Sequence, residues 1–333
     1  MAKESLPIVS VVVPIYNREK IIEKCARSLF EQTLDDIEYV FVDDGSTDKS
    51  VEVLKRVLEN YPKRKPWVKI ICLPHNMGVA VARREGIENA FGQYIIHCDT
   101  DDWIDNNTYE LLYSKAKEHN ADIVGCDIRH EYPNYHYDVH QRYADTIEDN
   151  IKNLLLGLIF PSLCTSLTRR RLIIDNRISF PEGLNVGEDL LFNMQLYINA
   201  KIITGIDKPL YHYTHTAASS SEGKITPQSI YSCAEVGRRV KLLVTKAGYG
   251  RRFAKEIAFR QFTLKFGLVR KFKNDDNYKT WLTIAPETHK YIWQYTQYNK
   301  ILRLMLWLAA YRMMPIAQII NCAIEWKNRL ISS

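Results

Sequence analysis

Short apolar runs alternate with amphipathic stretches over residues 1–128. The apolar runs are rich in β-branched and aromatic residues, which is typical of buried strands in a parallel sheet. They are Ile8–Pro14, Glu38–Val42, Val68–Cys72, Tyr94–Cys98 and Asp122–Cys126. Helical periodicity covers the intervening stretches Lys20–Glu31, Lys49–Glu59, Val79–Ala90 and Thr108–Glu118. This alternation predicts an α/β fold with a mostly parallel sheet flanked by helices.

The rest of the chain has a different pattern. Strand and helix periods mix over residues 129–221, where Leu190–Ile198 favours a helix and Lys201–Thr214 a strand. The small residues Ala217–Ser221 predict a loop. From Thr226 the pattern is helical to the end. We therefore expect an α/β domain over residues 1–221 and a C-terminal helical region over residues 222–333.

Composition indicates an ordinary globular protein. Hydrophobic residues make up 46% and charged residues 25% of the 333 positions, which argues against disorder. The seven cysteines are scattered without a C-x-x-C pair, which argues against a disulfide framework or a zinc site and favours a reducing cytosol. The first residues lack the apolar stretch of a signal peptide. A cytoplasmic location is expected.

Positive charge is concentrated in the last quarter of the chain. Residues 250–333 contain fifteen Lys and Arg against five Asp and Glu, a net charge of +10 in a chain whose total is +6. The uncharged stretch Met313–Ile324 is too short and too polar to span a bilayer. A helix that lies in the membrane interface is favoured, because apolar and basic residues alternate closely in the sequence. These residues are Trp307, Leu306, Tyr311 and Met314 beside Lys300, Arg303 and Arg312.

This basic region predicts peripheral binding to an anionic membrane surface on the cytoplasmic side rather than to nucleic acid. Packing of the same apolar residues onto the catalytic domain, or onto a second subunit in a homo-oligomer, stays the alternative.

Two acidic clusters follow predicted strands. Asp43-Asp44-Gly45-Ser46 comes after the run Tyr39–Val42, and Asp99-Thr100-Asp101-Asp102 comes after Tyr94–Cys98. In open α/β sheets, ligands bind beyond the carboxyl ends of such strands. Asp99 and Asp101 are expected on one side of an extended segment, where their oxygens suit Mn²⁺ or Mg²⁺. A solvated turn that caps the next helix is the alternative interpretation.

A third acidic motif, Gly187-Glu188-Asp189, opens the predicted helix Leu190–Ile198. The helix dipole stabilises carboxylates there whatever their function. If its carboxylate faces the crevice, Asp189 is a candidate general base. His212 and His215 bracket Tyr213 at a strand end, and packed or surface histidines are favoured there.

Taken together, the motifs resemble those of the family-two inverting glycosyltransferases with the GT-A fold, over roughly residues 6–221. They are Val11-Val12-Val13-Pro14-Ile15-Tyr16-Asn17, Asp43–Asp48, Asn76-x-Gly78-x-Ala80-x-Ala82-Arg83, Asp99–Asp102 and Gly187–Asp189. The resemblance implies transfer of a sugar from a nucleotide diphosphate donor, usually a UDP-sugar, with inversion at the anomeric carbon. The acceptor would be a hydroxyl of a glycan or a lipid-linked sugar, as in bacterial surface polysaccharide synthesis.

The resemblance also implies roles for individual residues. Residues 1–128 would bind the nucleotide-sugar and residues 129–221 the acceptor. The implied nucleotide-sugar-binding set is Pro14, Tyr16, Asn17, Asp43, Asp44, Arg83, Asp99, Thr100, Asp101, Asp102 and Glu188. Within it, Asp44 would bind uracil. Asp99 and Asp101, with His215 as an additional metal or diphosphate contact, would hold Mn²⁺ or Mg²⁺. Asp189 matches the base that deprotonates the acceptor.

Other functions remain as alternatives. A nucleotidyltransferase would be expected to carry a glycine-rich, lysine-bearing loop after the first strand, where this chain has Pro14-Ile15-Tyr16-Asn17-Arg18. A phosphatase would place its nucleophilic D-x-D after the first strand, with Thr or Val where Trp103 stands. A non-catalytic nucleotide-sugar-binding module is the third alternative, and the presence of Asp189 together with the D-x-D speaks against it.

Overall fold

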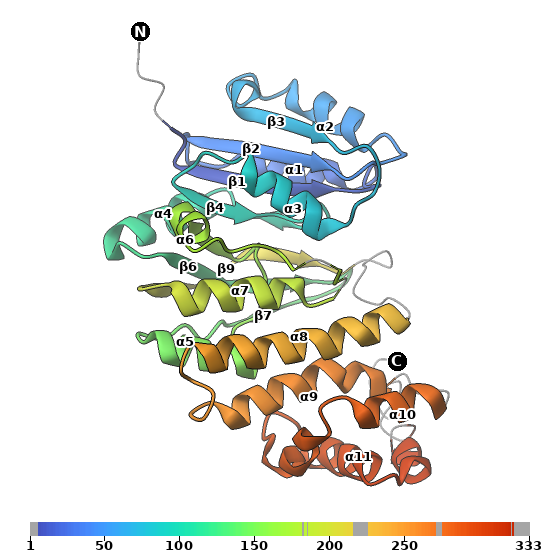
Figure 1. Cartoon of the computed structure of the whole chain (residues 1–333). Coiled ribbons are helices and arrows are strands. Elements are labelled where there is room, and N and C mark those ends of the chain that lie inside the picture. Colours follow the sequence, from blue (N-terminus) through green and yellow to red (C-terminus); the bar gives the residue numbers. More distant parts are fainter. Residues whose placement is uncertain are drawn as a thin grey trace. The chain divides into compact units, whose positions relative to one another are not determined.

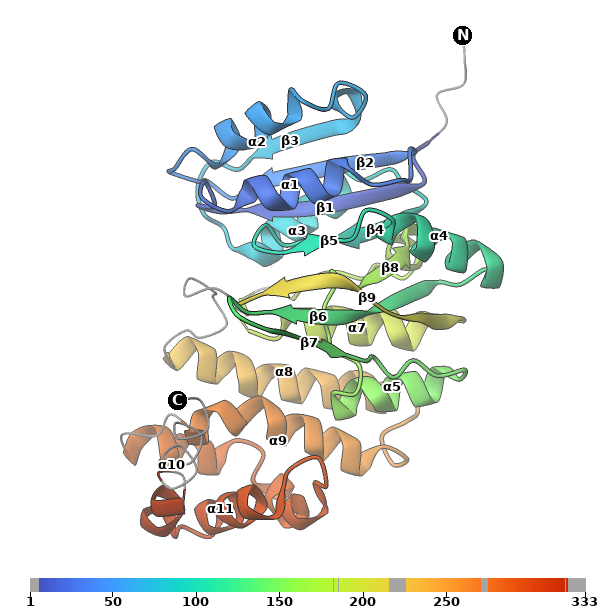
Figure 2. The ribbon, with the colours of Figure 1, turned by 180° about the vertical axis from the view of Figure 1, so that it is seen from behind.

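The computed structural model describes residues 6–181, 183–184, 186–215, 226–270, 275–320 and 322. The predicted loop Ala217–Ser221 lies outside these residues. The chain divides into two compact units, residues 1–223 and 224–333, which are shown in Figure 1 and, from behind, in Figure 2. Each unit is described by itself.

The first unit is built on one mixed sheet with the strand order β3-β2-β1-β4-β8-β6-β9-β5, and β7 pairs with β6. The strands are β1 (Val9–Ile15), β2 (Ile37–Asp43), β3 (Val68–Cys72), β4 (Tyr94–His97), β5 (Trp103–Ile104), β6 (Ile123–Glu131), β7 (His136–Val139), β8 (Ser166–Arg169) and β9 (Ile203–Thr214). β3, β2, β1 and β4 are parallel, β8 is antiparallel to β4 and β6, and β6 and β9 are parallel. The predicted mostly parallel sheet is confirmed.

Helices flank this sheet. They are α1 (Ile22–Phe30), α2 (Ser50–Leu58), α3 (Val79–Glu88), α4 (Thr108–His119), α5 (Ile147–Leu156), α6 (Arg170–Asp175) and α7 (Glu188–Asn199), with a short 3-10 helix η1 (Lys65–Trp67). The elements expected over residues 1–128 are found with shifted ends. β5, β7, β8, α5 and α6 were not predicted from the sequence. β5 is only two residues long, and β7 is largely exposed, so neither has a buried apolar run.

The central strand β1 is buried on both faces, and α3 packs directly on it. Val9, Val11, Val12 and Val13 are all fully buried. A Cβ atom added to Gly86 of α3 would lie 2.2 Å from Cγ1 of Val12. Only glycine permits this close approach between helix and strand.

The second unit is helical throughout its described part. It contains α8 (Pro227–Lys246), α9 (Ala254–Arg270), α10 (Asp275–Thr283), the 3-10 helix η3 (Pro286–Gln294) and α11 (Lys300–Ala310). Lys265 is fully buried. Its ammonium group donates to the carbonyl of Ile284 at 2.5 Å, and burial lowers its pKa to about 7. None of the described helices combines the length and apolar character needed to cross a membrane.

The expected interfacial residues of this unit need correction. Leu306 and Met314 are buried rather than available to a membrane. Leu306 lies with Met305, Leu308 and Ala309 among the buried residues of α11, and Met314 follows that helix. Tyr311 is exposed as expected. Other exposed apolar side chains of the same region are Ile301, Leu304, Met313, Ile316 and Ile319.

The close contact of α3 with β1 gives a stability prediction. Gly86→Ala should lower the free energy of unfolding by roughly 1–2 kcal/mol, because the clash with Val12 outweighs the better helix propensity of alanine. Urea unfolding followed by circular dichroism measures the change. The exposed Glu88→Ala on the same helix is the control and should stay within about 0.5 kcal/mol of wild type. An unchanged or more stable Gly86→Ala protein would contradict the packing argument.

Candidate active site

The loops that follow β1 and β2 are tied together at the C-terminal edge of the sheet. The side-chain oxygen of Asn17 accepts the N–H of Thr47 at 2.9 Å, and the hydroxyl of Ser46 accepts the N–H of Asn17 at 3.0 Å. Asn17 has a φ of 53°, a left-handed conformation that asparagine tolerates well. Pro14 is half-buried near the end of β1, and Tyr16 is 42% exposed. These predicted nucleotide-binding residues therefore lie on an accessible rim.

The two aspartates after β2 are both buried. Both carboxylate oxygens of Asp44 accept backbone N–H groups at the start of α3, from Met77 at 2.6 Å and Gly78 at 2.9 Å. Asp43 accepts the N–H of Ser46 at 3.3 Å. Asp44 thus fixes the N-terminus of α3, a role that the sequence analysis did not foresee. Each carboxylate oxygen of Asp44 has a second lone pair that could accept a hydrogen bond from uracil. This contact stays a prediction.

The D-x-D motif lies in a turn. β4 ends at His97, and the N–H of Asp102 donates to the carbonyl of Asp99 at 3.1 Å. The expected extended segment with Asp99 and Asp101 on one side is therefore wrong. The reason is that Asp102 is held elsewhere: its carboxylate accepts the Tyr211 hydroxyl at 2.5 Å and the N–H of Thr214 at 2.8 Å. These two bonds tie the turn to the end of β9.

Arg83 of α3 joins acidic groups that are far apart in the sequence. One guanidinium nitrogen lies 2.9 Å from Asp99, and the other lies 2.5 Å from Asp189 and 3.5 Å from Glu188. The Arg83 side chain is only 5% exposed, whereas those of Asp99 and Asp189 keep 34% and 28% exposure. The carboxylates thus retain access to a ligand while the cation is enclosed.

These contacts shift the pKa values of the acidic groups in opposite directions. Burial alone would raise the pKa of Asp99, but Arg83 outweighs it and holds that pKa below its usual value. Burial raises the pKa of Asp189 to about 7, against the opposing effect of Arg83. A carboxyl with a pKa near neutrality is suited to proton transfer.

For Asp101 and Asp102, no cation in the described part of the chain lies close enough to offset the cost of burying their charge, so the pKa of each is raised. Burial, followed by repulsion from Asp99, raises the pKa of Asp101. Burial and the charges of Asp99 and Asp101 raise that of Asp102 to about 8. A divalent cation would relieve the repulsion between Asp99 and Asp101, and their carboxylate oxygens are the hard ligands that it prefers. Such a cation commonly completes its shell with substrate phosphates and water. Among the described residues, however, no group of three or more His, Cys, Asp or Glu is gathered as a ligand set.

His215 makes a different contact from the one expected. Its Nε2 lies 2.8 Å from Nδ1 of His130, and burial followed by the neighbouring His215 lowers the pKa of His130. His212 is packed, as the sequence analysis favoured: it is buried and stacks on Trp103 with ring centroids 3.5 Å apart. A metal contact of His215 stays a prediction. Thr100 is buried, and its hydroxyl lies 3.5 Å from the carbonyl of Pro14.

Some residues that support the acidic groups were not predicted from the sequence. Tyr211 and Thr214 hold Asp102, and their only sequence signal was a place near the end of a predicted strand. His97 is buried on β4, and burial and Arg83 lower its pKa to about 3, so the ring is neutral. These residues carry no motif, because their role depends on distant partners.

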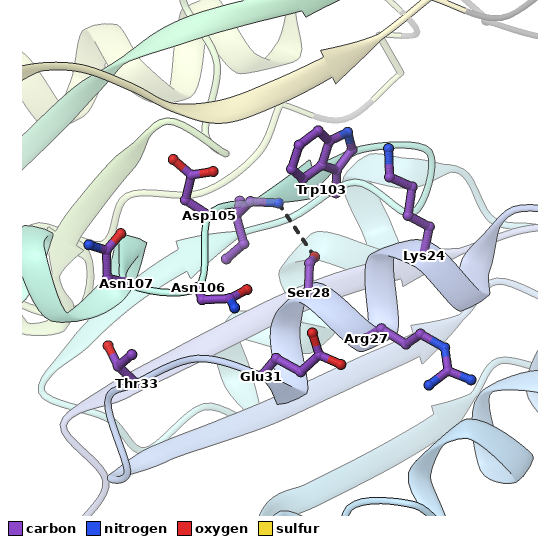
Figure 3. A pocket seen from close by; sticks show the side chains of 10 residues that line it. Lys24, Arg27, Ser28, Glu31, Thr33, Trp103, Asp105, Asn106 and Asn107 are labelled. Atoms are coloured by element: carbon purple, nitrogen blue, oxygen red, sulfur yellow. Dashed lines mark hydrogen bonds between the residues drawn. The ribbon is translucent and has the colours of Figure 1, made fainter.

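A cavity of about 710 Å³ lies beside this site rather than in it. Figure 3 shows it between α1 and the segment from Trp103 to Asn107. Lys24 extends toward Trp103 here, with its ammonium nitrogen 4.1 Å from the ring centroid. The lining residues are Lys24, Arg27, Ser28, Glu31, Thr33, Trp103, Ile104, Asp105, Asn106 and Asn107. They do not include Asp99, Asp101 or Asp189.

Known proteins resemble this chain in sequence and in fold. EpsH of Bacillus subtilis strain 168, provisionally described as a glycosyltransferase, is 34% identical over 214 residues, covering 62% of this chain and 60% of EpsH. A cholesterol galactosyltransferase of Borreliella burgdorferi is 29% identical over 229 residues, covering 62% of this chain and 59% of that protein. The chain thus matches about three fifths of the length of these relatives.

The crystal structure of Staphylococcus aureus TarS residues 1–349 with UDP-GlcNAc superposes with a TM-score of 0.74 at 24% identity, covering 96% of this chain and 92% of that one. This likeness confirms the expected GT-A fold with C-terminal helices. The family model described as "Glycosyl transferase family 2" matches residues 10–176. The motif resemblance is therefore confirmed: the chain belongs to glycosyl transferase family 2.

Proposed function

We propose that this protein transfers a sugar from a UDP-sugar to an acceptor hydroxyl with inversion at the anomeric carbon, assisted by Mn²⁺ or Mg²⁺. The observation that carries the proposal is the Arg83 cluster, defined as Arg83, Asp99, Glu188 and Asp189. It unites the D-x-D turn and the candidate base at the carboxyl edge of a parallel sheet, where such folds bind ligands.

The proposed donor is supported by solved structures of the same fold. TarS residues 1–349 have been solved with UDP and with UDP-GlcNAc. In this chain, the rim formed by Pro14, Tyr16 and Asn17, with Asp43 and Asp44 beneath it, would receive the nucleotide. Asp99, Thr100, Asp101 and Asp102 would line the diphosphate and ribose side, and Arg83 and Glu188 would complete it.

Asp189 is the proposed general base. It opens α7, so its backbone is held rigidly, and its partly exposed carboxylate can accept the proton of an acceptor hydroxyl. One in-line displacement then inverts the anomeric carbon, and no covalent nucleophile is needed. Arg83 stabilises the ionised carboxylate of Asp189 and can also offer its charge to the departing diphosphate.

Asp99 and Asp101 are the residues that would hold the divalent cation, with His215 as a further candidate. When bound, the cation would neutralise the negative charge that develops on the leaving diphosphate. A mannosyltransferase from Pyrobaculum calidifontis, solved with GDP-Man and Mn²⁺, has the same fold at a TM-score of 0.53. The shared fold supports a divalent metal as the cofactor.

Relatives suggest acceptors of surface polymers and lipids. The poly(ribitol-phosphate) β-glucosyltransferase of Bacillus spizizenii is 29% identical over 236 residues, and the cholesterol galactosyltransferase acts on a lipid by its name. We propose a glycan or lipid-linked acceptor and peripheral binding to an anionic membrane surface. The exposed Ile301, Leu304 and Tyr311 beside Lys300 and Arg312 support the membrane contact.

The alternative functions can be separated by one assay. Release of UDP from a panel of UDP-sugars, with and without added acceptors, is expected of a glycosyltransferase. Release of pyrophosphate from UTP would indicate a nucleotidyltransferase instead. Binding of UDP-sugar without any turnover under all conditions would indicate a non-catalytic module.

The metal proposal predicts the behaviour of Asp101→Asn. The variant should lose EDTA-sensitive turnover and bind the UDP-sugar more weakly, because one hard oxygen ligand is replaced by a neutral amide. Calorimetry with UDP-sugar and Mn²⁺ measures binding, and UDP release measures turnover. Asp145→Asn, at an exposed position on the segment before α5, serves as a control and should behave as wild type. Full activity in EDTA would refute metal assistance.

The base proposal predicts that Asp189→Asn keeps its fold and UDP affinity while kcat falls by about 10²–10⁴-fold, the usual contribution of a general base. In the wild type, the pKa of about 7 means that Asp189 gains a proton as pH falls. The rate should therefore decline as pH drops through 7 and level off above it. Rate measurements from pH 5.5 to 9 at saturating donor test this. A variant that keeps more than about a tenth of kcat, a barrier change below 1.4 kcal/mol, is incompatible with the role.

The membrane proposal predicts co-sedimentation of the full chain with vesicles that contain anionic lipid. Each Lys or Arg near such a surface contributes about 1 kcal/mol, an attraction that salt screens. Binding should thus weaken between 50 mM and 500 mM NaCl and be absent with neutral vesicles. Ile301→Asp should reduce it, whereas the equally exposed Tyr231→Asp on α8 is the control. Binding that ignores lipid charge and salt would leave packing as the role of these residues.

A further inference from the structure

A slab of nearly parallel aromatic rings stands beside the D-x-D turn. It consists of His130, Tyr132, Tyr135, Tyr137 and His215, from the hairpin of β6 and β7 and the end of β9. Tyr132 stacks on Tyr135 with centroids 4.6 Å apart and on His215 with centroids 4.0 Å apart, and His130 stacks on Tyr137 at 4.8 Å. The planes in these three pairs differ by only 5° to 9°.

Hydrogen bonds join this slab to the acidic turn. Asp102 accepts the N–H of Thr214, and the next residue, His215, donates its N–H to the carbonyl of Glu131 at 2.8 Å. The ring of His215 in turn stacks directly on the ring of Tyr132. The slab thus stands at the same carboxyl edge of the sheet as Asp99 and Asp101, since β6 and β9 run parallel to β4 through β8.

The outer rings of the slab are open to solvent. Tyr135 is 58% exposed and Tyr137 is 44% exposed. At these exposures the two rings contribute little to the core. The electron-rich face of an aromatic ring attracts the C–H groups of a pyranose, and tyrosine offers this surface at a small cost in side-chain entropy.

The charges of the hairpin do not favour an anionic acceptor. Arg129, the one Lys or Arg among the hairpin residues 123–139, is paired with Asp138 through two contacts of 2.6 Å and 2.9 Å. Glu131 adds a further negative group that faces His212. A polyol phosphate would call for cations here, whereas a pyranose ring calls for the aromatic faces that are present.

We propose that this aromatic slab is an acceptor subsite that selects a pyranose ring over an acyclic polyol phosphate, with Tyr135 and Tyr137 as the residues that determine specificity. The inference rests on the proposed glycosyl transfer and names the chemical class of its acceptor. This subsite, formed by the hairpin of β6 and β7 and the end of β9, places the pyranose ring beside the acidic turn.

The test is saturation-transfer NMR on the full chain with UDP present, so that the nucleotide pocket is filled. The probes are the methyl β-pyranosides of glucose, galactose and N-acetylglucosamine, with ribitol 5-phosphate for comparison. We expect wild type to bind at least one pyranoside and to bind ribitol 5-phosphate more weakly. Tyr135→Ala and Tyr137→Ala should each weaken pyranoside binding roughly tenfold through loss of a stacking ring.

Two control variants separate stacking from unfolding. Tyr135→Phe keeps the ring and should bind as wild type. Phe91→Ala removes a ring that is 53% exposed in the segment before β4, at the opposite edge of the sheet, and should have no effect. The inference is overturned if no pyranoside binds wild type, if the alanine variants bind as wild type does, or if ribitol 5-phosphate binds as tightly. Absence of UDP release from every UDP-sugar would instead refute the proposed function.

Discussion

The buried guanidinium of Arg83 is the interaction on which the acidic edge of the sheet depends. Asp99, Glu188 and Asp189 come from two distant segments and face one another in partly desolvated surroundings. Removing one member of a buried charge cluster typically costs several kcal/mol, because the remaining charges are left unpaired. The position of this one side chain therefore decides whether the carboxylates can be held close enough to act on a common ligand.

Backbone contacts set the position of Arg83 in turn. Asp44 binds the first N–H groups of α3, and Gly86 allows the helix to lie against Val12. Arg83 is placed between these two anchor points. Asp44 of the Asp-Asp-Gly sequence after β2 thus has a structural role at the start of α3 in addition to the nucleotide contact proposed for it. A change in either anchor would be transmitted to the acidic groups through the helix.

The sequence predicted the elements and residues whose signal is local. β1, β2 and β4 are mostly apolar runs because both of their faces are buried, and acidic motifs follow β2 and β4 directly. It could not predict β7, which is exposed, or the triple pairing of Arg83, which depends on three distant carboxylates. It placed Asp99 and Asp101 on an extended segment because nothing nearby revealed that Tyr211 and Thr214 bind Asp102. It also assigned Leu306 and Met314 to the surface, since buried and exposed apolar residues of a helical region look alike in sequence.

The antiparallel strand β8 has a consequence for catalysis. It pairs with Tyr94 and Ile95 of β4 on one side and with Ile123–Gly125 of β6 on the other, so a ladder of hydrogen bonds joins the strand that leads to the D-x-D turn with the strand that leads to the aromatic hairpin. A hinge between these two regions would have to break that ladder. Their spacing is therefore established when the chain folds, and the entropy of bringing two reactants into register is lowered before either substrate arrives.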